Sequence, residues 1–334
     1  MKTLNIAVIG IGDFGRLHIR VLQENPLSKV VAVCSRTPEK LKAICSEFDI
    51  PHWFTDVEEL LQLPDLDGVV VATGEDTHYS YTKMAVEQGK HVLLEKPVCL
   101  DLVDGKALLD LAKESKVHIL PGHILRHDAA YASAQAALAN GAKGEIQSIR
   151  VKRNVPIERF SLHARTHPVF MALAHDIDIL IWLTGSRAKR VTAMSRKTQP
   201  EFENPDILFG IAEMENGCLC SLETQWRLPN EYGQYLDTEL EVMTSKGNLK
   251  LKCPGNGLSS MFDGVKHSYD LTLWPEIGGK LTGALATEIQ HFLDLITGEA
   301  KEPVVSMEEA IKGIEMALML IEASETGETV TQKF

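Results

Sequence analysis

The most constraining feature of this sequence is a glycine-rich turn that follows its first apolar run. The run Leu4–Ile9 leads into the turn "GIGDFG", and an amphipathic stretch, Phe14–Glu24, comes next. A second apolar run, Val30–Cys34, follows. A strand, a glycine turn, a helix and a second strand in this order are typical of a βαβ unit with parallel strands. The chain is therefore expected to begin with a parallel sheet that helices cover on both faces.

This alternation of strands and helices continues to about residue 120 and then changes. Downstream, hairpin turn signals at "ENG" (215–217) and "SKG" (245–247) separate apolar segments, which favours antiparallel pairing. We predict an α/β protein with a doubly wound parallel sheet of the Rossmann type in residues 1–121. Residues 122–334 are expected to form an α+β domain with a mostly antiparallel sheet.

The expected elements are as follows. Further strands of the first domain are expected at Gly68–Ala72, His91–Leu94 and Val117–Leu120, and its helices at Pro38–Phe48, Val57–Leu61, Thr77–Gln88 and Leu102–Lys113. Helices of the second domain are expected at Asp128–Asn140, His175–Thr184, Ala284–Thr297 and Met307–Ser324. Its strands are expected at Ile146–Val155, Val191–Ser195, Ile207–Met214, Cys218–Trp226, Leu236–Thr244 and Asn248–Leu251.

Composition and charge disfavour several classes of protein. The formal net charge of −12 disfavours nucleic acid and anionic membranes as main partners. No apolar run reaches the roughly 18 residues that a membrane-spanning helix requires. The N-terminus lacks the features of a signal peptide, so a cytoplasmic protein is expected. The six cysteines include no CxxC pair, and several are expected to be buried free thiols.

The glycine turn is a candidate cradle for a dinucleotide. Gly10 would allow the turn, Gly12 would let backbone N–H groups approach a pyrophosphate, and Gly15 would let the helix pack closely on the strand. The N–H groups and dipole at the helix N-terminus favour a phosphate there. Asp13 and Phe14, which lie between the glycines, are expected to border the cofactor. The alternative is a glycine-rich turn that binds no ligand.

The residues after the second strand indicate which dinucleotide binds. An acidic side chain there would hold the ribose 2′-hydroxyl of NAD, but this chain has Ser35, Arg36 and Thr37. A hydroxyl and a guanidinium can bind a 2′-phosphate, and nothing acidic in this stretch would repel it. NADP is therefore the predicted cofactor and NAD the alternative. It is also possible to interpret Arg36 as a solvated loop residue.

Several segments together resemble a known family. "GKHVLLEKPVCLD" (89–101), "HDIDILIWLTG" (175–185) and the closing "SMEEAIKGIEMALMLIEASETGETV", together with the glycine turn, resemble the Gfo/Idh/MocA family of sugar and polyol oxidoreductases. The resemblance implies an open-faced sheet in the second domain, through which members form dimers or tetramers. It also implies that Lys96 bonds the reacting hydroxyl and that His175 is the catalytic histidine. The residues that it places around the cofactor are Thr73, His78, Glu95 and Lys96.

Lys96 and His175 have the chemistry that oxidation of a secondary alcohol needs. A hydride must leave the carbon and a proton must leave the oxygen, so a base is required at the hydroxyl. Lys96 follows a predicted buried strand, and ligands bind at the carboxyl ends of strands in such sheets. His175 can relay a proton near neutral pH. Asp178 and Trp182 would share its side of the helix, and Asp178 would either orient the imidazole or cap the helix.

One position departs from the family pattern. Members often carry an aspartate four residues before the catalytic histidine, where this chain has Met171. Methionine cannot accept a proton, so either Lys96 and His175 suffice or a nearby group substitutes, and His163 and His167 are the nearest candidates. His163, His167 and His175 are also a conceivable metal-ligand set. The family chemistry needs no metal, however, and no metal site is predicted.

A run of basic residues precedes His175. Residues 150–167 contain five basic side chains and one acidic side chain, Glu158, in a chain of net negative charge. We expect this segment to border the substrate pocket and to bind an anionic group such as a phosphate or a carboxylate. The alternative is that these side chains face water or a neighbouring subunit. The basic residues are Arg150, Lys152, Arg153, Arg159 and Arg165, and substrate contacts are expected from Lys96, Arg126, His163, Arg165, Met171 and His175.

Two functions of different classes are consistent with these residues. The first is an oxidoreductase that transfers a hydride between NADP(H) or NAD(H) and a secondary alcohol or ketone of a sugar, polyol or sugar derivative. The second is a regulator of the same fold that binds the dinucleotide without turnover. Met171 favours the regulator, whereas Lys96 and His175 favour the enzyme. A homodimer or homotetramer with a small-molecule substrate is expected.

Overall fold

The computed structural model forms two compact units. The first comprises Met1–His127 and Leu273–Ile311, and the second comprises Asp128–Thr272 and Lys312–Phe334. The first crossing between units thus lies at residue 127 rather than at the predicted 121, and the chain later returns to the first unit. The sequence does not reveal this return, because the pattern of an amphipathic helix does not identify the sheet on which it packs. The structure describes residues 3–230, 236–253, 258–262, 265–268 and 271–332.

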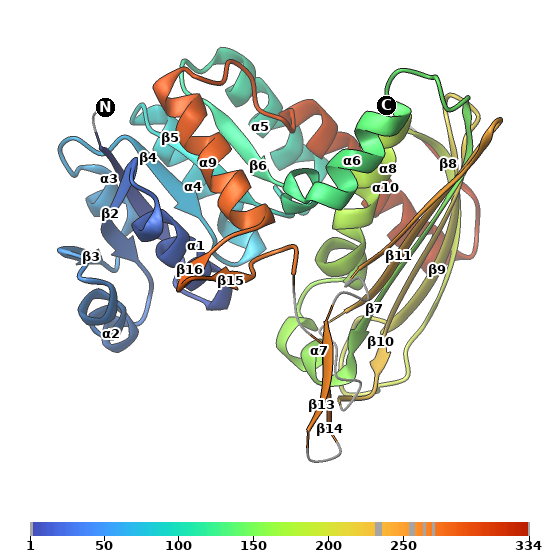
Figure 1. The fold of residues 1–334 in the computed structure, drawn as a ribbon, viewed down its shortest axis with the longest axis horizontal. Coiled ribbons are helices and arrows are strands. Elements are labelled where there is room, and N and C mark those ends of the chain that lie inside the picture. The colour runs from blue at the N-terminus through green and yellow to red at the C-terminus, as the bar shows by residue number, and fades with distance from the viewer. Residues whose placement is uncertain (1–2, 231–235, 254–257, 263–264, 269–270, 333–334) are drawn as a thin grey trace. The chain divides into compact units, whose positions relative to one another are not determined.

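The first unit is built on a six-stranded parallel sheet (Figure 1). Its strands are β1 (Leu4–Ile9), β2 (Ser28–Cys34), β3 (His52–Phe54), β4 (Gly68–Val71), β5 (His91–Glu95) and β6 (Ile119–Gly122). They lie in the order β3-β2-β1-β4-β5-β6, and all neighbouring pairs are parallel. This order confirms the predicted doubly wound sheet of the Rossmann type. Only the edge strand β3 was not predicted, because its 3 residues are too few to show a periodicity.

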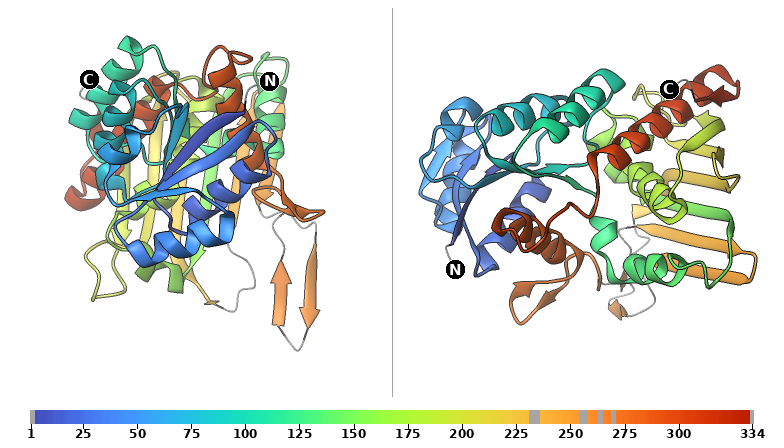
Figure 2. Two further views of the ribbon diagram at one scale, coloured as in Figure 1. Left: turned by 90° about the vertical axis from the view of Figure 1, so that its left-hand side faces the viewer. Right: turned by 90° about the horizontal axis from the view of Figure 1, so that it is seen from above.

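Helices cover both faces of this sheet. They are α1 (Asp13–Glu24), α2 (Pro38–Phe48), α3 (Val57–Leu61), α4 (His78–Glu87), α5 (Leu102–Glu114) and α9 (Ala284–Thr297), with the short 3-10 turns η1 (Glu75–Thr77) and η2 (Ile124–His127). Figure 2 shows α1 and α9 on one face and α4 and α5 on the other. The central strands β1 and β4 bury nearly all their side chains, as expected for strands with helices on both sides. A two-stranded hairpin, β15 (Glu276–Ile277) and β16 (Lys280–Leu281), precedes α9.

The second unit is built on a seven-stranded sheet. Its strands are β7 (Ile146–Pro156), β8 (Ala188–Arg196), β9 (Ile207–Met214), β10 (Leu219–Leu228), β11 (Asp237–Thr244), β12 (Gly247–Cys253) and β17 (Val330–Thr331). They lie in the order β12-β11-β7-β10-β9-β8-β17, and every neighbouring pair is antiparallel except β7 and β10. The predicted mostly antiparallel sheet is therefore confirmed. A separate hairpin pairs β13 (Ser259–Phe262) with β14 (Val265–Ser268).

The sheet of the second unit has one covered and one open face. The helices near this sheet, in chain order, are α6 (Ala129–Leu138), α7 (Ile157–His163), α8 (Ala174–Thr184) and α10 (Met307–Thr326). Figures 1 and 2 show α6, α8 and α10 on one face, and no described helix on the other. The open face exposes large apolar side chains, which are Met194, Phe209, Ile211, Leu219 and Met243. None of the described helices is both long enough and apolar enough to cross a membrane.

The described cysteines are free thiols, and most of them are buried, as predicted. Cys34, Cys99, Cys218 and Cys220 are buried. Burial raises the pKa of the Cys34 thiol to about 11 and that of Cys99 to about 12. These thiols are therefore neutral apolar packing groups at neutral pH. The side chain of Cys253 lies outside the described part of the structure.

Candidate active site

The glycine turn folds as a tight cradle between β1 and α1. Gly10 has a φ of +98°, and a Cβ there would lie 2.2 Å from the carbonyl oxygen of Ala72. A Cβ at Gly15 would lie 2.0 Å from the carbonyl oxygen of Gly10. Gly10 therefore permits the turn, and Gly15 lets the helix approach the turn closely. These are the roles that the sequence predicts.

Gly12 differs from the other two glycines because it borders open space. No heavy atom lies within 4 Å of the position that its Cβ would occupy. Gly12 is the N-cap residue of α1, and no described side chain caps the N–H groups at this helix end. Asp13 is exposed and Phe14 is half-buried in the same turn. Open space beside uncapped helix N–H groups fits the pyrophosphate of a dinucleotide.

The segment after β2 has an acidic neighbour that the sequence pattern does not show. Arg36 is exposed, and Ser35 and Thr37 are half-buried. The pKa of the Cys34 thiol, at the end of β2, is raised mainly by burial and additionally by the charge of Asp56, which caps α3. Asp56 is therefore close to the end of β2. A carboxylate there opposes a bound 2′-phosphate, which weakens the case for NADP.

His78 contacts the backbone segments that follow two neighbouring strands of the sheet, β4 and β5. Its side chain is buried, with Nδ1 2.7 Å from the carbonyl oxygen of Pro97 and Nε2 3.3 Å from that of Thr73. Burial is the main cause that lowers the pKa of His78. A neutral imidazole has one N–H and can donate to only one of these two carbonyl oxygens, and the contact with Pro97 is the shorter. Thr73 is half-buried, and its hydroxyl lies 2.7 Å from that of Thr77.

Glu95 and Lys96 lie at the carboxyl end of β5, on the same edge of the sheet as the glycine cradle. Glu95 Oε1 lies 2.8 Å from His18 Nε2, and Glu95 Oε2 accepts a hydrogen bond of 3.2 Å from the backbone N–H of Lys96. His18 is fully buried and belongs to α1, the helix that begins at the cradle. Glu95 therefore connects the cradle helix to the backbone of Lys96. The side chain of Lys96 is half-buried.

Glu288 is a further buried acid of this unit, and the sequence-based predictions do not include it. Glu288 of α9 is fully buried, and neither of its carboxyl oxygens hydrogen-bonds to a described residue. Burial and, second, the charge of Glu95 raise the pKa of Glu288 well above its usual value. A signal was present in the sequence, because Glu288 lies at helical spacing among Leu285, Ile289 and Phe292 on an apolar face.

Arg126 is engaged in a structural ion pair. Its side chain is 1% exposed, and Nη1 donates to Glu309 Oε1 at 3.0 Å and to the carbonyl oxygen of Val304 at 3.1 Å. The substrate contact predicted for Arg126 therefore has no support from the structure, since the guanidinium is buried in this pair. The sequence does not show the pairing, because Glu309 is 183 residues away.

In the second unit, His175 lies in the first turn of α8. The preceding turn, η3 (Val169–Leu173), is π-helical, an irregularity that is frequent at functional sites. The next residue, Asp176, accepts hydrogen bonds from Arg153 of β7, with Nε–Oδ2 2.6 Å and Nη2–Oδ1 3.2 Å. His175 is half-buried and Asp178 is buried. The turn that carries His175 is therefore bound to the sheet.

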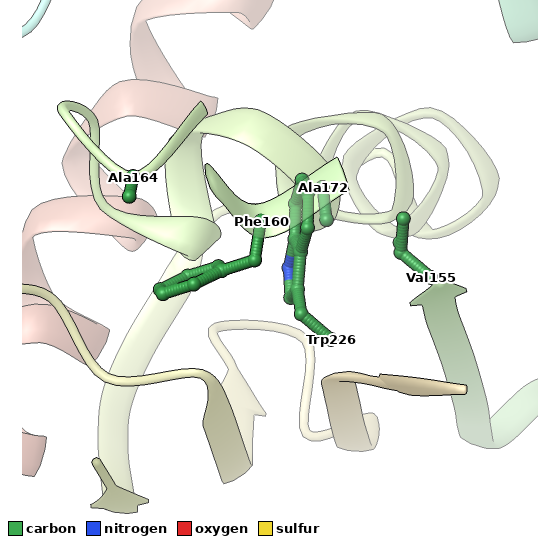
Figure 3. Packing of buried hydrophobic residues seen from close by; sticks show 5 residues of the cluster. All are labelled: Val155, Phe160, Ala164, Ala172 and Trp226. Carbon is green, nitrogen blue, oxygen red and sulfur yellow. The ribbon is translucent and has the colours of Figure 1, made fainter. Parts of the chain in front are cut away.

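Met171 packs on an apolar cluster beside this turn. Figure 3 shows the ring of Trp226 between Phe160 and Ala172. Met171 packs against this cluster, and the His163 ring lies 6.0 Å from that of Trp226. The side chain at the family's aspartate position thus makes apolar contacts and offers no proton acceptor. The cluster comprises Val155, Phe160, Ala164, Ala172 and Trp226.

The basic run 150–167 does not form one cationic patch. Lys152 pairs with Asp237 at 2.9 Å, and Arg153 is bound to the first turn of α8 as described above. Both acids that neutralise these side chains come from outside the run. The other basic side chains of the run differ in exposure: Arg150 and Arg165 are exposed, and Arg159 is half-buried.

The histidines of this region do not form a metal centre in the described structure. His167 Nδ1 accepts the N–H of Val169 at 3.2 Å, and burial lowers the pKa of His167 to about 4. His167 is therefore a neutral residue that supports η3. Among the described residues, no group of three or more His, Cys, Asp or Glu side chains is placed to hold a metal ion, and this includes His163, His167 and His175.

Two family profiles match the chain. Residues 4–123 match the profile described as "Oxidoreductase family, NAD-binding Rossmann fold". Residues 131–250 match the profile described as "GFO/IDH/MocA C-terminal domain". The first match includes the glycine cradle and Lys96, and the second includes His175.

Three of the similar proteins are inositol dehydrogenases. The chain is 25% identical over 320 residues to scyllo-inositol 2-dehydrogenase (NAD(+)) of Bacillus subtilis (strain 168), and the alignment covers 93% of this chain and 91% of that protein. It is 26% identical over 304 residues to inositol 2-dehydrogenase of Corynebacterium glutamicum, and the alignment covers 88% of this chain and 86% of that protein. The crystal structure of scyllo-inositol dehydrogenase from Lactobacillus casei, with bound NAD(H) and scyllo-inositol, has the same fold, with a TM-score of 0.85 at 22% identity over 99% of each chain.

Proposed function

The chain belongs to the Gfo/Idh/MocA family of oxidoreductases, and we propose that it is an NAD(P)-dependent dehydrogenase that acts on a CH–OH group of an inositol or a related polyol or sugar. One observation carries the proposal most directly. The open glycine cradle at Gly12 and the residue Lys96 lie at the same carboxyl edge of one parallel sheet. Ligands bind at this edge in doubly wound sheets.

The cradle would hold NAD(H) through its pyrophosphate. The N–H groups at the start of α1 would bind the phosphates, and the space beside Gly12 would admit them. When bound, the cofactor supplies the nicotinamide carbon that exchanges a hydride with the substrate.

The preference between NAD and NADP remains a separate prediction. Arg36 favours a 2′-phosphate, whereas Asp56 and the NAD named for the relatives favour NAD. Thermal unfolding with each cofactor at equal concentration tests it, because the tighter ligand stabilises more. A larger shift with NAD would refute the NADP preference.

Lys96 and His175 would both take part in moving the proton of the reacting hydroxyl group. Lys96 would bind the reacting oxygen and take its proton when the alcohol is oxidised, and His175 would relay that proton. Two contacts support these roles. The backbone of Lys96 is bound by Glu95, and the turn of His175 is bound through Asp176. Met171 contributes no proton transfer, so Lys96 and His175 are proposed to suffice.

The proposed substrate is neutral, although the prediction of an anionic group can be tested beside it. The test uses Arg159 and Arg165, the two arginines of the run that lie closest in the sequence to His175. Replacing both of these arginines by alanine should then raise the KM of sugar acids and sugar phosphates while leaving that of neutral inositols unchanged. Unchanged KM values for every anionic substrate would refute the anion site.

The open face of the second unit is proposed to bind a second copy of the chain. Ile211, Leu219 and Met243 line a hollow of about 290 Å³ on this face, beside further exposed apolar residues. Contiguous exposed apolar surface favours association. Light scattering should show a dimer or tetramer for the wild type and a smaller species for Ile211→Asp. A monomeric wild type would refute this assembly.

Turnover of a polyol panel tests the proposed function. Absorbance of reduced nicotinamide should rise when NAD⁺ is mixed with the protein and scyllo-inositol, myo-inositol or a related sugar. The second candidate, a dinucleotide-binding regulator, is favoured by the apolar contacts of Met171. Tight NAD(H) binding without turnover on any member of the panel would favour the regulator and refute the dehydrogenase.

A further inference from the structure

A buried ion pair links the sheet of the second unit to the turn that carries His175. Arg153 of β7 and Asp176 of α8 are 23 residues apart in the chain, and their side chains are 5% and 4% exposed. Two hydrogen bonds, 2.6 Å and 3.2 Å long, join the guanidinium to both carboxylate oxygens. A bidentate pair fixes the plane of the carboxylate as well as its distance.

Arg153 belongs to a strand in the interior of the sheet. β7 has a neighbour on each side, and Arg153 lies opposite Thr224 of β10 and Thr238 of β11. Both threonines are buried. The guanidinium is therefore anchored on a strand whose backbone is paired along both edges.

Asp176, the other partner of the ion pair, lies next to an irregular helical turn. α8 begins directly after the π-helical turn η3, where the hydrogen-bonding pattern changes register. Asp176 is the residue after His175 in the first turn of α8, so the carboxylate that Arg153 holds determines the rotation of that turn. The direction of the His175 side chain follows from this rotation.

Stability alone does not account for the pair. Burying two charges costs about as much as their attraction returns, and apolar side chains of similar volume are often equally stable in such positions. A planar contact through two hydrogen bonds fixes the orientation of the two side chains, whereas an apolar contact does not.

We propose that Arg153 is a positioning residue for the dehydrogenase reaction, which acts only through His175 by fixing the rotation of the first turn of α8. This inference rests on the proposed role of His175. Arg153 itself is buried and does not touch substrate in this proposal.

A double-mutant cycle between Arg153 and His175 tests the proposal. Arg153→Lys keeps the positive charge but loses the two-point contact, and should lower kcat by about tenfold to a hundredfold. The pKa that limits kcat on the pH profile should shift with it, while the affinity for NAD(H), measured by calorimetry, should stay unchanged. In the His175→Gln background, followed by single-turnover kinetics, Arg153→Lys should have less than about a twofold effect.

Two further variants separate positioning from folding. The double variant Arg153→Met with Asp176→Leu replaces the pair by apolar side chains, and should unfold near the wild-type temperature while losing kcat as Arg153→Lys does. Arg187→Lys is the matched control, because Arg187 also forms an ion pair in this unit, 2.6 Å from Glu315. It should leave kcat unchanged.

Three results would overturn the proposal. Equal losses caused by Arg153→Lys with and without His175 would show that Arg153 acts by another route, and wild-type kcat in Arg153→Lys would show that the contact is not needed. In both cases an inactive His175→Gln variant would leave the proposed function intact. Full activity of His175→Gln would instead refute the role of His175, and this inference with it.

Discussion

Acidification should destabilise the first unit through one half-buried histidine, His127. Its ring lies 5.6 Å from that of His291, and its Nε2 is buried without a hydrogen bond to any described residue. Burial first, and then the charges of His291 and Arg126, lower the pKa of His127 to about 3. In an unfolded chain the pKa of histidine is about 6.5. The unfolded state therefore binds more protons than the folded state between these two values.

The sign and size of the effect follow from this difference. The stability associated with neutral His127 is complete above pH 6.5 and falls as the pH drops toward 3. Each pKa unit corresponds to about 1.4 kcal/mol, so acidification from pH 7 to pH 4.5 should remove about 3 kcal/mol from the free energy of unfolding through this residue. His167, whose pKa burial lowers to about 4, should add a similar loss in the second unit.

Urea unfolding at pH 7 and pH 4.5 measures this loss. Tryptophan fluorescence follows the unfolding of the wild type, of His127→Gln and of a control, His52→Gln, whose side chain is exposed. The His127→Gln variant should lose about 3 kcal/mol less than the wild type on acidification, and the control should behave as the wild type. Identical pH dependence of the wild type and His127→Gln would refute the reasoning.

Three further predictions concern the cofactor-binding unit. Gly12→Val should weaken NAD(H) binding in calorimetry by about tenfold or more with little change in unfolding temperature, because the side chain enters open space at the pyrophosphate site. Equal binding by Gly12→Val and the wild type would contradict the role of the glycine turn in binding. Gly15→Ala should lower the unfolding temperature, because its Cβ would meet the Gly10 carbonyl oxygen at 2.0 Å. Glu288→Gln should raise the unfolding temperature more at pH 8 than at pH 5, because the raised pKa of Glu288 makes its contribution complete at low pH and lost as the pH rises. A temperature difference that does not grow with pH would show that Glu288 is not held as the neutral acid.

Local patterns in the sequence predict much of the first unit. The strand, glycine turn and helix from Leu4 to Glu24 are encoded by consecutive residues, and the structure has them within one residue of the predicted bounds. The helix Ala284–Thr297 is also predicted correctly as a helix. Its packing against α1 is not, because the sequence pattern reports an apolar face but not its partner.

Long-range pairing explains the site features that the sequence does not show. Arg126 and Lys152 look like available cations in the sequence, yet they pair with Glu309 and Asp237. The link between His18 and Glu95 spans 77 residues and is equally invisible to a local pattern. Residue type predicts which groups can do chemistry, whereas their partners, and therefore their charge and freedom, come only from the fold.

Transfer of deuterium from a labelled substrate tests the central claim most directly. NAD⁺ and inositol carrying deuterium at the reacting carbon are mixed with excess protein, and the reduced cofactor is analysed by mass spectrometry after a single turnover. The wild type should yield deuterated NADH, and Lys96→Met and His175→Gln should yield it far more slowly although they bind NAD⁺ normally. Bound NAD⁺ that gains no deuterium from any labelled inositol, polyol or sugar, or equal rates in all three proteins, would contradict the account.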